Sequence, residues 1–232
     1  SLNNLAVSCG LTGQLKKALE LQKKAYELRI EALGEMHPDT LNSLDGLAVL
    51  YEDLGRKQKA VKPREKLYAQ RCKVFCERHP ATLKALDALG SLYGKMGRTG
   101  EMVEIKEKVY CMRSELLGKE NPNTLQSLRS LAVANFNNGD YAKALSLAQQ
   151  YYESLCRLKG TNHPDGIQAK ADMEQIRKQL VKELEILNSM FEFKIDTFSI
   201  HRPSKDVLRE NIKLPGIINA YQDEFFTFAE NV

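Results

Sequence analysis

The sequence predicts an all-α fold, built from pairs of antiparallel helices that repeat along the chain. The first observation is a repeated segment: HPDTLNSLDGLAVLYEDLG starts at His37, and a close copy, HPATLKALDALGSLYGKMG, starts at His79. The same step of 42 residues leads to NPNTLQSLRSLAVANFNNG at Asn121 and to HPDG at His163. The other two observations are apolar positions that recur with a helical period and a glycine at the end of each full copy.

The first helix of each pair is predicted from two leucine columns and a neighbouring column of small residues. Aligning the chain on itself gives the columns Leu2, Leu44, Leu86 and Leu128; Leu5, Leu47, Leu89 and Leu131; and Ala6, Ala48, Gly90 and Ala132. This spacing places the three columns on one face of a helix, and the small residues let a neighbouring helix approach closely.

Each first helix is expected to end at a glycine, because glycine adopts a positive φ at little cost. These glycines are Gly13, Gly55, Gly97 and Gly139. A second helix then follows, marked near its start by Ala18, Ala60, Met102 and Ala144 and in its middle by Tyr26, Tyr68, Tyr110 and Tyr152. Two helices joined by a short turn form a hairpin.

Proline separates one hairpin from the next, at Pro38, Pro80, Pro122 and Pro164. Proline stops the long second helix and suits the first turn of the helix that follows. We expect capping hydroxyls nearby from Thr40, Thr82 and Thr124, and a capping or packing role for His37, His79 and His163. Since one such hairpin cannot bury its apolar face alone, the hairpins are expected to stack.

The repeated residues resemble the signature of the tetratricopeptide repeat at Leu44, Leu47, Ala48, Tyr51, Gly55 and Ala60. The longer second helix, which ends in LG-x-x-HPDT, is similar to the kinesin light chain and nephrocystin type of this repeat. The resemblance implies a right-handed α-solenoid of antiparallel hairpins. We expect a repeat array over 1–162, divided into 1–36, 37–78, 79–120 and 121–162.

Both ends of the array depart from the repeat pattern. Residue 1 falls inside a first helix, so we expect this chain to be part of a longer protein. The repeat columns decay after His163, which predicts a C-terminal capping helix over 163–190. The non-repeat tail, 191–232, begins with FEFKIDTFSI, whose alternation is typical of a strand. The tail is the start of another domain, a strand-containing cap, or a segment that folds back into the groove of the array.

The first helices are expected to line the concave groove of the solenoid, so the groove is the candidate binding surface. Mixed amides, charges and apolar side chains there suit an extended peptide, whereas the simpler interpretation is an ordinary solvated helix face. Asp45, Glu52, Asp53 and Asp87 would bias the middle of the groove towards a basic peptide, with Arg129 as a counter-charge. The groove positions are Asn3, Asn42, Asp45, Val49, Glu52, Asp53, Lys84, Asp87, Ser91, Lys95, Gln126, Arg129, Val133, Phe136 and Asn137.

Composition excludes several classes of partner. The 232 residues carry a net charge of +4, with acidic and basic residues interleaved, so no basic stripe for nucleic acid is present. No apolar run approaches the roughly 18 to 20 residues that cross a bilayer, and the N-terminus has no signal-peptide pattern. The five cysteines are odd in number and scattered, which favours unpaired thiols in a reducing compartment and a cytoplasmic protein.

The sequence contains no recognisable set of catalytic or metal-binding residues. Cys72, Cys76 and His79 have a spacing that could begin a zinc site, but no fourth ligand is evident, so we predict no metal and no other cofactor. No phosphate loop, H-E-x-x-H or G-x-S-x-G motif occurs. We therefore predict that the chain is not an enzyme but a scaffold that binds peptide segments of a protein partner. The alternative is a regulatory or sensor segment of a larger multidomain enzyme or signalling protein, which contacts its own neighbouring domains.

Overall fold

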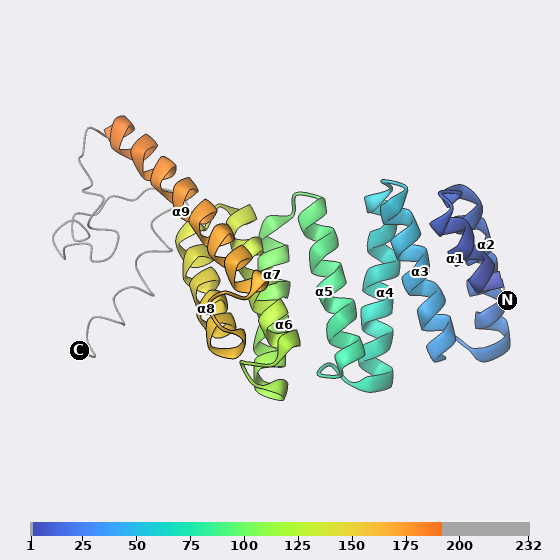
Figure 1. The fold of residues 1–232 in the computed structure, drawn as a ribbon. Helices are drawn as coiled ribbons and strands as arrows, with labels where there is room; N and C mark the ends of the chain where they lie inside the picture. Colours follow the sequence, from blue (N-terminus) through green and yellow to red (C-terminus); the bar gives the residue numbers. More distant parts are fainter. Residues whose placement is uncertain (1, 192–232) are drawn as a thin grey trace. The chain divides into compact units, whose positions relative to one another are not determined.

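The computed structural model describes residues 2–191, except for the side chains of Asn3 and of 187–191. Within that range the chain is all α, as predicted (Figure 1). The predicted strand pattern lies outside the described residues, apart from Phe191, which ends the last of the described helices. The helices are α1 (Leu2–Leu11), α2 (Leu15–Leu33), α3 (Pro38–Asp53), α4 (Lys57–Phe75), α5 (Pro80–Lys95), α6 (Thr99–Leu117), α7 (Pro122–Asn138), α8 (Tyr141–Lys159) and α9 (Pro164–Phe191).

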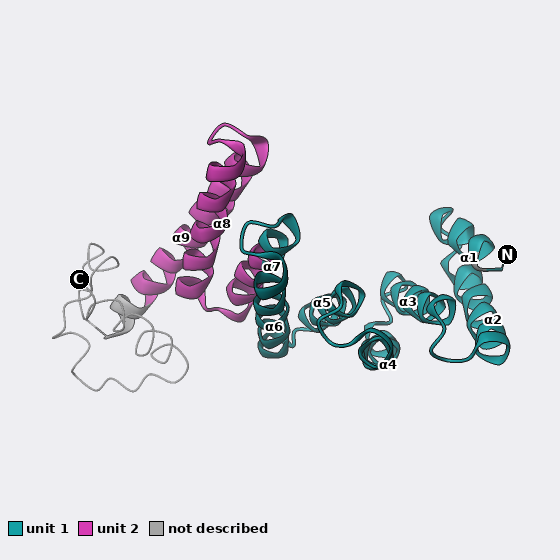
Figure 2. Cartoon of the chain, turned by 90° about the horizontal axis from the view of Figure 1, so that it is seen from below, with its two compact units in different colours: residues 1–127 teal, residues 128–232 magenta. Residues whose placement is uncertain are grey.

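The chain divides into two compact units, 1–127 and 128–232, and the second is described as far as residue 191 (Figure 2). In the first unit each helix from α1 to α6 packs against its neighbours in sequence, so the hairpins α1–α2, α3–α4 and α5–α6 lie in a row. In the second unit α8 and α9 pack along each other. The division into repeats at 36, 78, 120, 162 and 190 stays a prediction.

The first helix of a hairpin starts at a residue whose side chain accepts a hydrogen bond from the backbone. His37 Nδ1 accepts from the amide of Asp39, and His79 Nδ1 from that of Ala81, both at 3.2 Å. His163 does the same at 3.2 Å, and Asn121 replaces the histidine with its Oδ1 at 2.9 Å. A proline follows each of these residues in the first turn, so the predicted capping role of the three histidines is confirmed.

The predicted role of the threonines needs correction, because they do not cap the helices that they begin. Their hydroxyls instead donate to carbonyl oxygens near the end of the preceding helix, at 3.2 to 3.3 Å. The pairs are Thr40 with Arg29, Thr82 with Arg71, and Thr124 with Arg113. All three threonines are fully buried, so each hydroxyl needs a protein partner and finds one in the neighbouring hairpin.

Glycines occupy both kinds of turn at positive φ. The predicted column of Gly13, Gly55, Gly97 and Gly139 has φ between 70° and 86°, as expected. A second column follows the second helices at Gly34, Gly118 and Gly160, and its fourth member is Cys76. Cys76 has φ 72° and ψ 165°, a backbone conformation that residues other than glycine rarely adopt.

The core follows the predicted columns except in α1, where Leu2 is only half-buried and Leu5 is exposed. In the first unit Leu44, Leu47 and Leu86 are buried, and a Cβ added at Gly90 would lie only 2.7 Å from Ile105 Cγ2, which explains the small residue there. Leu5, however, is 50% exposed, because no described helix packs against that side of α1. In the second unit α9 buries a stripe at helical spacing, consisting of Ala169, Met173, Ile176 and Leu180.

Candidate binding surface

Within each first helix the predicted groove positions share one face by their spacing, and we call these faces the first-helix surface. On α3 and α5 the side chains of Asn42, Val49, Asp53, Lys84 and Lys95 are exposed, while those of Asp45, Glu52, Asp87 and Ser91 are half-buried. On α7, Gln126, Arg129, Val133 and Asn137 are exposed and Phe136 is half-buried. The side chain of Asn3 is outside the described part of the chain.

Four charged side chains of the first unit form a network across this surface. Arg64 of α4 donates to Glu52 Oε1 at 2.8 Å from Nη2 and at 3.1 Å from Nε, and it also pairs with Asp45. Lys95 of α5 donates to Glu52 Oε2 at 2.7 Å, which ties α5 to α3. The Arg64 side chain is only 8% exposed, so its charge depends on these partners.

The network controls the ionisation of Glu52. Burial by itself raises the pKa of this carboxyl, but hydrogen bonds from Lys95 and Arg64 outweigh burial and hold that pKa below its usual value. Glu52 is therefore ionised, and both of its carboxylate oxygens already accept hydrogen bonds from Arg64 and Lys95.

A second network occupies the equivalent place between α5 and α6. Lys106 is buried, and its Nζ donates to Asp87 Oδ1 at 2.8 Å, to the Asp87 carbonyl at 2.9 Å and to Ser91 Oγ at 2.7 Å. Lys106 stands 42 residues after Arg64, so the two cations are repeat equivalents. Both reach from a second helix to the first helix of the same hairpin.

These pairs remove the main support for a negatively biased groove. Asp45, Glu52 and Asp87 each have a basic partner from the same chain, and only Asp53 of the four carboxylates remains as an exposed acidic group without a described pair. The prediction of a negative groove rests on the first helices alone, whereas the second helices supply the compensating positive charges of Arg64 and Lys106. A preference for a basic segment does not follow from this surface.

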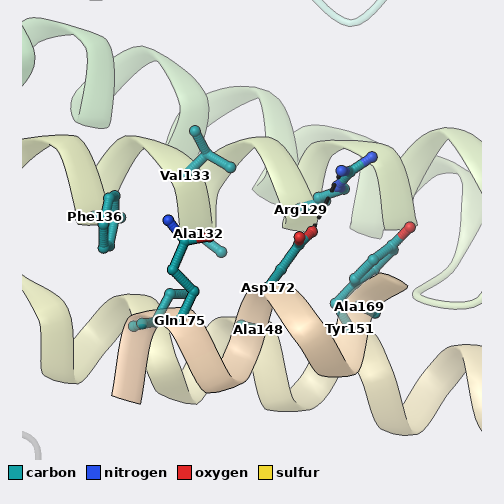
Figure 3. Close-up of a pocket in the computed structure, with 10 residues that line it drawn as sticks. Arg129, Ala132, Val133, Phe136, Ala148, Tyr151, Ala169, Asp172 and Gln175 are labelled. Carbon is teal, nitrogen blue, oxygen red and sulfur yellow. Dashed lines mark hydrogen bonds and ion pairs between the residues drawn. The ribbon is translucent and has the colours of Figure 1, made fainter. Parts of the chain in front are cut away.

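The second unit carries a pocket on the first-helix surface, with a volume of about 240 Å³ (Figure 3). Arg129 and Asp172 face each other at its edge, with Arg129 Nη2 donating to Asp172 Oδ2 at 3.3 Å. The remaining walls are mostly apolar. The lining consists of Arg129, Ala132, Val133 and Phe136 from α7, Ala148 and Tyr151 from α8, and Ala169, Asp172, Gln175 and Ile176 from α9.

Sequence reasoning found three residues of this pocket, Arg129, Val133 and Phe136, and missed the others. The α9 residues were missed because that helix has lost the repeat columns. Ala148 could have been found, since it is the small member of a column that otherwise holds long side chains. Tyr151 lies in the wall, and burial raises the pKa of its hydroxyl, so it is a neutral wall residue.

Metal and thiol chemistry receive no support from the described residues. Across 2–191 no group of three or more His, Cys, Asp or Glu side chains lies together as a metal site would require. His79, which the zinc spacing included, caps α5 with Nδ1 and stacks on Phe75 at 4.5 Å between ring centroids. All five cysteines are free thiols, as expected.

Comparison with known proteins identifies the family. The family model of the tetratricopeptide repeat matches residues 1–73 and 81–157. The chain belongs to the tetratricopeptide repeat family. A search of the curated proteins finds no match for this repeat protein.

Solved structures narrow the type of repeat. One is a protein of Podosopora anserina whose description names kinesin light chain nearly identical TPR-like repeats; it shares 26% identity with a TM-score of 0.66, covering 83% of this chain and 96% of that chain. Another, BtubC of P. vanneervenii, shares the fold at 18% identity and a TM-score of 0.62, covering 84% and 82%. The repeat protein is thus of the kinesin light chain type, an α-solenoid as predicted.

The family gives a coarse view of function. Tetratricopeptide repeats in general mediate contacts between proteins, and folds of this type typically serve as non-enzymatic scaffolds. Among the described helices of this repeat protein, none is both long and apolar enough to cross a membrane.

Proposed function

We propose that this protein is a non-enzymatic interaction scaffold that binds extended peptide segments of a protein partner on its first-helix surface. The observation that carries the proposal is the pocket beside α7, whose lining includes Arg129, Val133 and Phe136 at positions expected to contact a ligand. A recess of this kind can hold a side chain while neighbouring polar groups bond the peptide backbone.

The bound segment need not be basic. In the first unit the surface offers exposed amide, lysine and valine side chains beside carboxylates that are already paired, so its local charges largely cancel. Such a surface suits a segment of mixed or no charge, because an excess of either sign would find few free counter-charges. Five free thiols support a reducing, cytoplasmic location, and interleaved charges argue against nucleic acid as the partner.

A second candidate is a regulatory segment that contacts neighbouring domains of a larger protein. The apolar edge of α1 favours it, since Leu5, Val7 and Leu11 are 50%, 54% and 85% exposed. Three exposed large apolar residues on one short helix fit a surface that another part of a protein covers. The two candidates use different surfaces and are separable by experiment.

Selection of random twelve-residue peptides on the immobilised 232-residue chain tests the proposed function. Val49→Asp and Val133→Asp place a charge on the first-helix surface at exposed positions, so the fold should tolerate them. Val74→Asp is the matched control, because Val74 is similarly exposed but lies on α4, a second helix. We expect selected peptides to bind at least one surface variant tenfold more weakly and the control unchanged.

The competing results are equally clear. Peptides that bind all three variants as well as the parent chain would rule out the first-helix surface. Peptides whose binding is lost only on replacing Leu11 with Asp would point instead to the α1 edge and the regulatory candidate.

A further inference from the structure

One column of the second helices determines what fills the space beside each first helix. Its members, 42 residues apart, are Gln22, Arg64, Lys106 and Ala148. Arg64 and Lys106 are buried and reach polar groups on α3 and α5, so their long side chains occupy that space in the first unit. Gln22 is also buried, and its amide donates to the Ser43 carbonyl at 3.1 Å.

Ala148 cannot fill the space beside its first helix, α7, because its side chain is a single methyl group. The pocket of the second unit is found at this position, with Ala148 in its lining together with Ala132 and Ala169, all three buried at the level of the helix packing (Figure 3). Its volume of about 240 Å³ is below the roughly 300 to 1,000 Å³ of sites that hold a whole small molecule. The space therefore matches one side chain.

The charge of the pocket selects the chemistry of that side chain. Arg129 and Asp172 neutralise each other at the edge, and Gln175 is uncharged, so the lining has no spare charge for an ionic ligand. A charged group placed against Ala132, Ala148 and Ile176 would lose its hydration without a partner.

The edge of the pocket suits a polypeptide. Arg129 supplies hydrogen-bond donors, Asp172 supplies acceptors, and the exposed Gln175 amide supplies both. These groups match the alternating N–H and C=O of an extended backbone, whereas a lipid chain or a small hydrocarbon would leave them unused.

We infer that this pocket takes one uncharged, large aliphatic or aromatic side chain from an extended segment of another protein, and that Ala148 is the residue that makes the pocket available. The inference rests on the proposed function and adds the class of side chain and the residue that determines specificity. In the same column, Arg64 and Lys106 close the equivalent space, so the selectivity for an apolar anchor belongs to the fourth repeat.

The test uses the full 232-residue chain with labelled alanine, valine and isoleucine methyl groups. The probes are blocked pentapeptides, Gly-Ser-X-Ser-Gly, in which X is leucine, phenylalanine, lysine or glutamate. We expect the leucine or phenylalanine peptide to shift the methyl signals of Ala132, Val133, Ala148 and Ile176 saturably, with at least tenfold weaker binding of the two charged peptides.

Ala148→Met fills the pocket with an uncharged chain about as long as lysine, and the column already accepts side chains of that length. Ala148→Gln repeats the test with the residue found at position 22. Ala171→Met is the matched control, because Ala171 is exposed on α9 and outside the lining. We expect both Ala148 variants to lose binding by at least tenfold while the control binds normally and thermal unfolding shows all three folded.

Each other result overturns the inference in a distinct way. Normal binding by both Ala148 variants would show that the pocket is not the site, while surface binding elsewhere would still leave the proposed scaffold standing. No binding of any probe, together with no selected peptide in the preceding experiment, would end both proposals. Methyl shifts that depend on protein concentration, or binding seen only after residues 192–232 are removed, would assign the pocket to a second copy or to the tail.

Discussion

Replacing Cys76 with glycine should stabilise the protein by about 1 kcal/mol. Cys76 follows α4 with φ 72° and ψ 165°, while its repeat equivalents Gly34, Gly118 and Gly160 hold nearly the same angles without a side chain. A residue other than glycine in this region costs roughly 1–3 kcal/mol. Glycine adds about 0.4–1 kcal/mol of conformational entropy to the unfolded chain, and the difference favours glycine.

The side chain itself contributes little to oppose this gain. Cys76 is an exposed free thiol, and its backbone contacts do not involve the sulfur: its amide donates to the Cys72 carbonyl at 3.1 Å, and its carbonyl accepts from Thr82 Oγ1 at 2.8 Å. Both hydrogen bonds remain available to glycine. Relief of the backbone is therefore the dominant effect.

Urea unfolding of the full chain under reducing conditions measures the change. With a slope of about 1–3 kcal/mol per molar urea, Cys76→Gly should raise the midpoint by about 0.3–1 M. Cys76→Ala removes the sulfur but keeps the Cβ, so its midpoint should stay near that of the parent chain. An equal rise for both variants would assign the effect to the thiol, and a fall for the glycine variant would refute the backbone argument.

Three further predictions concern the polar groups of the first unit. Arg64→Met should destabilise the chain by about 3 kcal/mol, the lower end of the range for breaking a buried ion pair. The lower end applies because Lys95 still donates a hydrogen bond to Glu52. Thermal unfolding should detect this loss. The pKa of Glu52 lies below its usual 4.5 in the folded chain, so its ionised form stabilises the fold above that value and the contribution is lost as the pH falls through the lower, folded pKa. Glu52→Gln should therefore lose less stability than the parent chain when urea midpoints are compared at about pH 5 and about pH 3; equal losses would contradict this. Thr82→Val keeps the shape but removes the hydroxyl that joins α5 to α4, which should cost about 1 kcal/mol in the same urea assay, while exposed Thr161→Val serves as a small-effect comparison.

The helices and their order could be predicted from sequence because the same physical requirements return every 42 residues. Proline after a capping residue and glycine at positive φ are local demands, which do not depend on distant parts of the chain. The first-helix surface could be predicted for the same reason, since the exposed face of a helix follows from its buried face.

The charge balance and the pocket could not be predicted in this way. The sequence predicted that Asp45 belongs to an open acidic surface, but in the structure Arg64, 19 residues away, pairs with it. The pocket depends on α9, where Asp172 pairs with Arg129 at a separation of 43 residues instead of the repeat step. Because α9 has lost the repeat columns, its sequence does not indicate which of its side chains will contact α7.

The buried threonine hydroxyls have a mechanical consequence for the first unit. Thr40 and Thr82 each join the start of one hairpin to the end of the preceding one, at the junction where a hinge would otherwise lie. Bending at such a junction would break a hydrogen bond in a place that water does not reach. Under tension we therefore expect these hairpins to move by small shear displacements along their helix faces. Hinge rotation at the connecting turns should be disfavoured.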